Sequence, residues 1–154
     1  MSNLNKSQID EFLGKAHSAA FATVDADGYP YNVPVNFVWQ DDKIYIHGRA
    51  SGTKTTNCEK NSKVGLLIYH MGELEYDPNQ ERACAVMVHY TSVIIKGNIR
   101  RLEDPAEKQK ILWDIVKKYT PPLTGASMVD ADVAKTSVYE ITPTSITGKT
   151  YPDE

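Results

Sequence analysis

The residues with the most evident chemistry lie in residues 45–57, where an aromatic and β-branched run ends and a helix is expected to begin. This stretch contains the small residues Ser51 and Gly52, followed by Lys54 and Thr55. The first N–H groups of a helix are unpaired and carry the positive end of its dipole, so they favour an anion. Two interpretations stay open on local sequence: a phosphate-binding turn, or an ordinary capped surface helix with an exposed lysine.

His47 stands immediately before this turn and is a candidate for an acid, a base or a hydrogen-bonding group. The alternative is that its ring only satisfies a buried backbone carbonyl. The other three histidines show no regular spacing with carboxylates or cysteines, so no metal site is expected. Ser92 lacks the strand–Gly-x-Ser-x-Gly–helix context of a nucleophile elbow, and we interpret it as a strand hydroxyl facing a pocket or a neighbouring strand.

Composition describes an ordinary globular chain, with 41% hydrophobic and 24% charged residues and a net charge of −3. Residues 1–154 are therefore expected to form one domain with one core. The acidic balance gives no support to a nucleic-acid or membrane-surface partner. No apolar run approaches the roughly 18 residues of a membrane span, so we expect a cytoplasmic protein. In that compartment Cys58 and Cys84 would be free thiols, with a disulfide as the alternative.

The elements that must position these residues are read from periodicity and turn signals. Helices are expected at 5–16, at 52–61 and after Asp104, where Pro105 suits the first helical position, with one helical turn at 130–134. Strands are expected at 19–24, 29–39, 43–47, 63–69, 83–99 and 137–141, with a last short run at 145–149. Residues 70–82 are interpreted as an exposed loop, and Gly97 as a bulge or bend.

These elements indicate a mainly β (α+β) fold, in which about six antiparallel strands form a small barrel with peripheral helices. Pro30 and Pro34 lack backbone donors, so their part of the second strand should lie at a sheet edge or a bulge. Asp27 and Gly28 form the usual pair of a tight hairpin turn.

The order of these elements resembles that of the pyridoxamine 5′-phosphate oxidase-like flavoproteins. Within that family the sequence looks most like the short Nim-type branch, which is associated with nitroimidazole resistance. The resemblance spans nearly the whole chain, and it is carried by the joint order of the motifs more than by any one of them. The matching stretches are residues 28–38 (GYPYNVPVNFV), 44–48 (IYIHG), 51–54 (SGTK), 90–97 (YTSVIIKG) and 146–149 (ITGK).

The resemblance implies a six-stranded antiparallel split β-barrel that forms a homodimer and binds FMN in a cleft between the subunits. In this sequence His47 matches a histidine at the rim of the flavin, and it is the one catalytic candidate. The flavin's phosphate needs fixed positive partners, whereas its ring needs an apolar slot with a few donors. The cofactor-binding residues expected are Val35, Asn36, Phe37, His47, Gly48, Ser51, Gly52, Lys54, Thr55, Ser92 and Val93.

The resulting hypothesis is an FMN-dependent oxidoreductase that takes electrons from a carrier such as NAD(P)H and reduces a small nitroimidazole- or nitroaromatic-like acceptor. The alternative is a non-catalytic module that binds flavin or haem in the same cleft, although no second haem ligand is evident. The pyridoxamine 5′-phosphate oxidases themselves share an arginine-bearing C-terminal segment. The chain after Thr136 contains no arginine, which argues against vitamin B6 oxidation.

Overall fold

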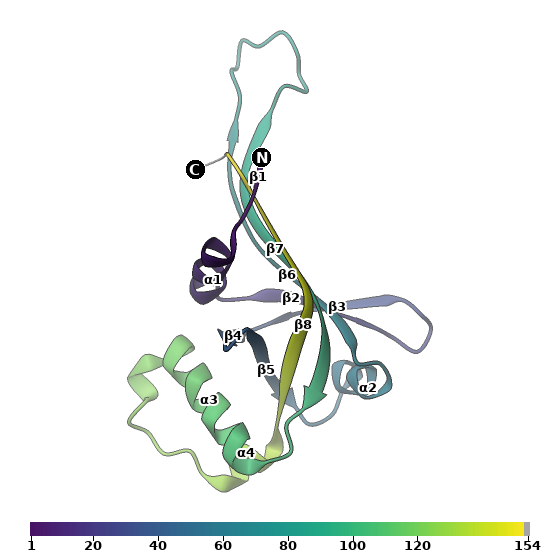
Figure 1. Ribbon diagram of the computed structural model, residues 1–154, viewed down its shortest axis with the longest axis vertical. Helices are drawn as coiled ribbons and strands as arrows, with labels where there is room; N and C mark the ends of the chain where they lie inside the picture. The colour runs from purple at the N-terminus through teal and green to yellow at the C-terminus, as the bar shows by residue number, and fades with distance from the viewer. Residues whose placement is uncertain (153–154) are drawn as a thin grey trace.

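The computed structural model describes residues 1–152, and its strands form a single antiparallel sheet (Figure 1). The sheet order is β3-β2-β6-β7-β8-β5-β4, with β1 beside β8, and the path stays open between β3 and β4. The strands are β1 (Ser2–Asn3), β2 (Ala19–Val24), β3 (Pro30–Val35), β4 (Phe37–Gln40), β5 (Lys43–Arg49), β6 (Lys63–Glu75), β7 (Met87–Arg101) and β8 (Thr136–Tyr151). The helices are α1 (Lys6–Lys15), α2 (Thr53–Lys60), α3 (Pro105–Tyr119), the 3₁₀ helix η1 (Pro121–Leu123) and α4 (Asp130–Lys135).

This architecture confirms the predicted fold class, a split antiparallel sheet with peripheral helices, but the sheet has eight strands and not six. The predicted strand 29–39 is divided at Asn36, because Val35 pairs with Ala19 of β2 whereas Phe37 pairs with Ile46 of β5. The chain therefore changes neighbours at Asn36. The predicted runs 137–141 and 145–149 form one continuous strand, β8, and the remaining additional strand is the two-residue β1, which no sequence signal indicated.

The two long helices begin as predicted. The side chain of Asn5 accepts a hydrogen bond from the backbone N–H of Gln8 at 3.0 Å, and the side chain of Gln8 accepts one from the N–H of Asn5, which completes a capping box for α1. At α3 the carboxylate of Asp104 accepts from the N–H of Glu107 at 3.1 Å, and Pro105 occupies the first turn.

The predicted exposed loop 70–82 was wrong in its first half, because β6 continues to Glu75 as a paired strand. Its polar residues gave no strand signal, and its pairing partner is supplied by β7 alone, with Leu74 opposite Val88. The predicted start of β7 at residue 83 was also wrong, since the strand begins at Met87. The irregularity expected at Gly97 is confirmed by a register shift against β8 between Lys96 and Gly97.

Two hydrophobic clusters lie on opposite faces of β5 and β8. One face carries Ile44, Ile46 and Ile141 into the interior of the sheet, where they pack with Phe21 and Ile95. The other face carries a second cluster that α3 and α4 cover, formed by Val38, Tyr45, Leu102, Ile111, Leu112, Ile115, Val133 and Val138. Side chains alternate between faces along a strand, so neighbouring residues of β5 enter different surroundings. No helix within residues 1–152 is both long enough and apolar enough to cross a bilayer.

Gly97→Ala should destabilise the fold by about 1–3 kcal/mol, the usual cost of overpacking. A Cβ atom at this position would lie 2.7 Å from the backbone oxygen of Thr142 and 2.9 Å from Cγ2 of Ile141, and neither can move aside cheaply. Gly14→Ala is the matched control, because no atom lies within 4 Å of its added methyl. In α1 this substitution should stabilise by about 0.5–1 kcal/mol. Denaturant unfolding measures both, and equal loss in the two variants would contradict the packing argument.

Candidate functional site

The turn between β5 and α2 leaves the start of the helix open. Gly52 occupies the position before the first helical residue with φ 130°, a conformation that essentially only glycine adopts, and no side chain caps the helix there. Ser51 and Gly52 are both exposed. The first N–H groups of α2 are therefore available to a negatively charged group from outside the chain.

Lys54 lies across the end of β5 and is half-buried. Its Nζ atom is 3.4 Å from the carbonyl oxygen of His47, and it would lie 2.6 Å from a Cβ atom on Gly48. Gly48 therefore makes the space that the ammonium occupies. Burial lowers the pKa of Lys54, and no carboxylate pairs with it among residues 1–152. The ammonium thus lacks a counterion.

Thr55 has a different place from its neighbours in the predicted phosphate turn. Its side chain is buried, and its hydroxyl donates to the carbonyl oxygen of Arg49 at 3.3 Å. Asn57, also buried, donates to the hydroxyl of Thr23 in β2 at 2.9 Å. These two bonds attach α2 to the sheet, so the Thr55 hydroxyl has a structural partner already.

His47 faces the α3 side of β5, because it pairs with Val138 of β8 and shares its face. Its Nδ1 atom is buried and has no hydrogen-bond partner within the described chain. Burial, and to a smaller extent the charge of Lys54, lower the pKa of the imidazole, so the ring is neutral at pH 7. A buried nitrogen without a partner is costly unless a ligand or water supplies one.

A cavity of about 300 Å³ lies beside His47. Helix α3 contributes Trp113 and Val116 to its wall, and the segment before α4 contributes Met128. The polar groups in its lining include Ser127, Asp132 and Thr136. An apolar space of this size with a few polar groups suits a small organic molecule.

The predicted strand beside the flavin lies at the bend between β3 and β4. Val35 and Phe37 are buried in the core, and Asn36 between them is exposed. The end of α3 fastens this bend. The hydroxyl of Tyr119 accepts from the N–H of Phe37 at 2.9 Å, and Lys118 Nζ donates to the carbonyl oxygen of Phe37 at 3.1 Å. The same ammonium lies 4.3 Å from the centre of the Phe37 ring.

Ser92 and Val93 do not join this group within one chain. Ser92 pairs with Lys149 of β8, whereas His47 pairs with Val138, eleven residue steps earlier on the same strand. At about 3.3 Å per residue this is a separation of roughly 35 Å along β8. Val93 is fully buried in the core, so no part of this residue is exposed to a ligand within one chain. The predicted cofactor-binding residues on β5, at the start of α2 and at the β3–β4 bend therefore lie close together. The two predicted residues on β7 lie apart from them.

Sequence reasoning missed Lys118 and Tyr119 as neighbours of the predicted cofactor strand. Basic residues are common in the last turn of a helix, where they complement its dipole, so Lys118 had no distinguishing signal. The wall of the cavity beside His47 was missed as well, because Trp113 follows the pattern of an ordinary core residue on α3. The contact of Lys118 with Phe37 joins segments about 80 residues apart. Such a contact leaves no local signal in the sequence.

Comparison with known families and structures gives consistent results. The family model described as pyridoxamine 5′-phosphate oxidase matches residues 5–150. A search of curated proteins gave no match. Among solved structures, a candidate 5-nitroimidazole antibiotic resistance protein from Bacteroides thetaiotaomicron is 25% identical, with a TM-score of 0.83 over 96% of this chain and 85% of that chain.

Two further structures share the fold at lower identity. The flavocytochrome Anf3 from Azotobacter vinelandii is 18% identical, with a TM-score of 0.85 over 97% of this chain and 68% of that chain. An FAD- and haem-binding protein from Mycobacterium smegmatis is 17% identical, with a TM-score of 0.83 over 97% of this chain and 74% of that chain. At these identities the likeness concerns the fold alone.

Stability should depend on pH through Lys118, whose pKa burial lowers to about 8 from an ordinary value of 10.5. Between these two pH values the unfolded chain holds the proton and the folded chain does not, so the free energy of unfolding rises with pH. The contribution should stay below about 1.4 kcal/mol per pH unit, the limit for one proton, because solvent screens the half-buried ammonium. Denaturant unfolding at pH 7–9.5 of the wild type, Lys118→Met and the exposed control Lys117→Met measures it. Wild-type and Lys118→Met curves that run parallel would contradict this assignment.

Proposed function

This chain belongs to the pyridoxamine 5′-phosphate oxidase family, and we propose that it is an FMN-dependent oxidoreductase acting on a small planar acceptor, nitroimidazole- or nitroaromatic-like. The observation that carries the proposal is the junction of β5 with α2. There, within the described part of the chain, a helix start without a cap and a lysine without a counterion adjoin a neutral histidine that lines an apolar cavity. We treat residues 1–154 as one FMN-binding domain, and we place it in the cytoplasm because Cys58 and Cys84 are both unpaired.

The residues at this junction fit a phosphate group. The N–H groups at the start of α2 and the Ser51 hydroxyl are exposed donors, and Lys54 supplies the positive charge. Gly48 and Gly52 allow close approach, since neither presents a side chain. Thr55 contributes through its backbone, because its hydroxyl is already bound to Arg49. These groups would hold the FMN phosphate, and when bound the flavin supplies the oxidation–reduction chemistry.

The ring of the flavin would lie against Val35, Asn36 and Phe37, where the bend exposes backbone and the Asn36 side chain. Lys118 and Tyr119 keep this bend fixed through their bonds to Phe37. A fixed surface keeps the distance between cofactor and acceptor constant, which is the protein's part in such a reaction.

His47 is the catalytic candidate of the proposal. Its ring lines the cavity and is kept neutral mainly by burial, and a neutral imidazole has one donor nitrogen and one acceptor nitrogen. The cavity beside it, about 300 Å³ with Trp113 and Met128 in its wall, would hold the acceptor and exclude water. No side chain has to act as an acid or base, so the role of His47 is to orient the acceptor.

We also propose a homodimer with the cofactor cleft at the subunit boundary. Ser92 lies roughly 35 Å from the His47 region along β8, so it can contribute to the same cleft only from a second subunit. Ser92 shares the outer face of the sheet with Leu67, Tyr69 and Ile94, whose side chains are 38%, 57% and 50% exposed. A sheet face with several exposed large apolar residues is typical of an interface.

A non-catalytic flavin- or haem-binding module is the second candidate. It is favoured by the names of two solved structures of the same fold, a flavocytochrome and an FAD- and haem-binding protein. His47, which lines the cavity, is the side chain that would bind haem iron. Oxidation of vitamin B6, the activity for which the family is named, is the least supported candidate because no arginine follows Thr136.

The purified protein should show a flavin absorption spectrum, either as isolated or after FMN is added, and should reduce a nitroaromatic with NAD(P)H. Sedimentation velocity followed at the flavin absorption band should show the mass of a dimer. A colourless protein that neither binds FMN nor turns over would overturn the proposal. Haem absorption, or flavin bound without turnover of any acceptor, would favour the binding module. A flavin-loaded monomer would contradict the homodimer.

Lys54→Ala should weaken FMN binding by about 1–3 kcal/mol, the scale of a charge-assisted hydrogen bond to phosphate. The fold should persist, because the Lys54 side chain makes only one long hydrogen bond to the residues that the structure describes. Lys60→Ala is the control, since Lys60 is exposed at the other end of the same helix. Fluorescence titration measures both affinities. Unchanged affinity in Lys54→Ala would show that the phosphate binds elsewhere.

A further inference from the structure

Lys108 stands on α3 where the helical pattern predicts an apolar side chain. The buried residues of this helix are Lys108, Ile111, Leu112 and Ile115, and this spacing of three and four residues marks the face that a helix buries. Only 8% of Lys108 is exposed. Lysines are almost never buried to this degree without a partner.

The Lys108 ammonium has no partner among residues 1–152. It forms neither a hydrogen bond nor an ion pair there. Burying a charge is costly unless a group of opposite charge offsets it, and natural proteins retain such costs mainly at functional sites. An anionic group from outside the chain would offset this one.

Lys108 lines a cavity of about 430 Å³ between the first turns of α3 and one side of α4, here called the Lys108 cavity. Pro105 and Ala106 of α3 and Val133 and Ala134 of α4 give it apolar walls. Apolar walls with a few polar groups are the usual composition of a small-molecule site. The buried lysine therefore stands in a space that a ligand can enter.

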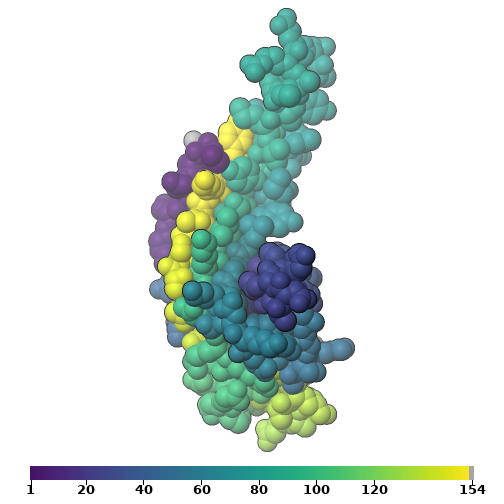
Figure 2. Space-filling view, turned by 90° about the vertical axis from the view of Figure 1, so that its right-hand side faces the viewer, coloured from purple at the N-terminus to yellow at the C-terminus, as the bar shows by residue number. Residues whose placement is uncertain are grey.

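The Lys108 cavity is separate from the cavity beside His47. The two have no lining residue in common, and α4 lies between them, with Asp130 and Ala134 lining the first and Asp132 and Thr136 the second. Helices α3 and α4 lie at the end of the molecule opposite the β6–β7 hairpin (Figure 1), and Figure 2 shows this end from the side in green and yellow-green. The proposed flavin function does not use the Lys108 cavity.

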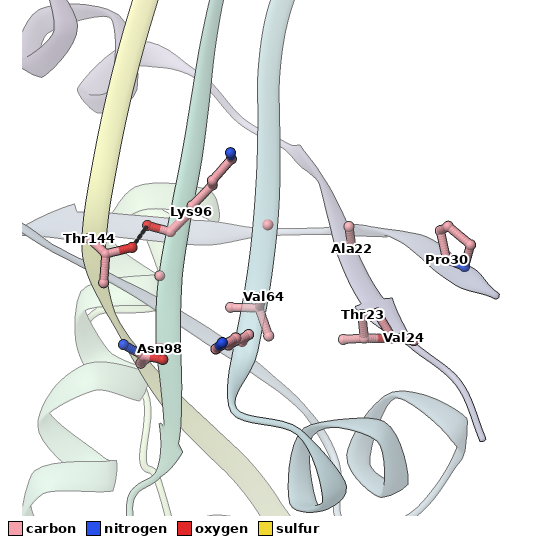
Figure 3. A pocket seen from close by; sticks show the side chains of 11 residues that line it. Ala22, Thr23, Val24, Pro30, Val64, Lys96, Asn98 and Thr144 are labelled. Carbon is pink, nitrogen blue, oxygen red and sulfur yellow. Dashed lines mark hydrogen bonds between the residues drawn. The ribbon is translucent and has the colours of Figure 1, made fainter. Parts of the chain in front are cut away.

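Burial of the lysine distinguishes this cavity from a larger one of about 450 Å³, which lies between the β2–β3 hairpin and strands β6 and β7 (Figure 3). Lys63 and Lys96 line the larger cavity, but both are exposed. Water therefore solvates their charges, and they need no ligand. Lys108 is the buried case.

Asp130 brings a second charge, of opposite sign, to the Lys108 cavity. Its carboxylate likewise has no hydrogen bond or ion pair within the described chain, and it is too far from Lys108 for the two to pair. A molecule with one anionic and one cationic group would satisfy both. A ligand with two negative charges would be repelled by Asp130.

We propose that the Lys108 cavity binds a free α-amino acid with an apolar side chain. The carboxylate of the ligand pairs with Lys108, its ammonium group pairs with Asp130, and its side chain lies against Val133 and Ala134. Each charge in the cavity then has a partner, and the apolar walls are covered by apolar atoms.

Titration of the purified protein with L-leucine, followed by NMR of ¹³C-labelled alanine and valine methyl groups, tests the site. Ala106 and Ala134 line the Lys108 cavity, whereas Ala126 lines the cavity beside His47. The signals of Ala106, Val133 and Ala134 should shift saturably and more than that of Ala126. The titration needs no FMN, so its result is independent of the proposed flavin function. Absence of a saturable shift at these three methyl positions, or a larger one at Ala126, would refute the proposal.

Two analogues of leucine test the pairing of charges. Isocaproate lacks the amino group, and isoamylamine lacks the carboxylate. Each should bind roughly tenfold more weakly than leucine, because each leaves one charge of the cavity without its partner. If either analogue binds as tightly as leucine, the ligand is not held as a zwitterion and the assignment fails.

Three variants complete the test. Lys108→Met keeps a long side chain on the buried face of α3 and should bind leucine roughly tenfold more weakly. Asp130→Asn should also lose affinity for leucine but should bind isocaproate at least as tightly as the wild type does, since a repulsive carboxylate is gone. Lys110→Met, exposed on the same helix, is the control and should bind leucine as the wild type does. Denaturant unfolding verifies that all three variants fold. Wild-type affinity for leucine in Lys108→Met or in Asp130→Asn would contradict the proposal.

Discussion

The pairing of β8 with two different strands is the constraint on which the rest of the structure depends. The sixteen residues of β8 pair with β5 over their first part and with β7 over most of their length. Ile141 stands opposite both Ile44 and Ile99, so it joins the two parts of the sheet. Within residues 1–152, strands β4 and β5 are hydrogen-bonded to the rest of the sheet only through β8. The same strand therefore positions His47 near one end and faces Ser92 near the other.

A buried carboxylate fixes the register at this junction. Glu140 of β8 accepts hydrogen bonds from Arg100 of β7 at 2.8 Å and from the hydroxyl of Tyr45 of β5 at 3.1 Å, and Lys43 lies 3.2 Å away. Burial alone would raise the pKa of Glu140, but the hydrogen bonds from its three partners outweigh it and hold the pKa below the ordinary value. A buried charge is tolerated only with such partners. A slip of β8 by one residue would turn Glu140 to the other face of the sheet and separate it from all three partners.

The sequence predicted those features of the fold that depend on interactions between residues close together in the chain. The caps at Asn5 and Asp104, the edge position of Pro30 and Pro34, and the irregularity at Gly97 all act within a few residues. The division at Asn36 was not predictable in this way, because it results from a change of pairing partner. The same holds for the site. Ser51, Gly52 and Lys54 form a local pattern, whereas the contact of Lys118 with Phe37 joins distant segments. The positions of Ser92 and His47 on different parts of β8 also needed the full topology.

Three local departures from ordinary protein chemistry meet at the junction of β5 and α2. Among residues 1–152, the helix start has no side-chain cap, Lys54 has no counterion, and the Nδ1 atom of His47 has no partner. Each raises the free energy of the isolated chain, and folded proteins retain such costs mainly where a ligand offsets them. An anion at the helix start would offset the first two at once. It would also weaken the effect of the Lys54 charge on the imidazole, which now contributes to the lowered pKa of His47. Anion binding and protonation of His47 are therefore coupled through Lys54, and by linkage each favours the other.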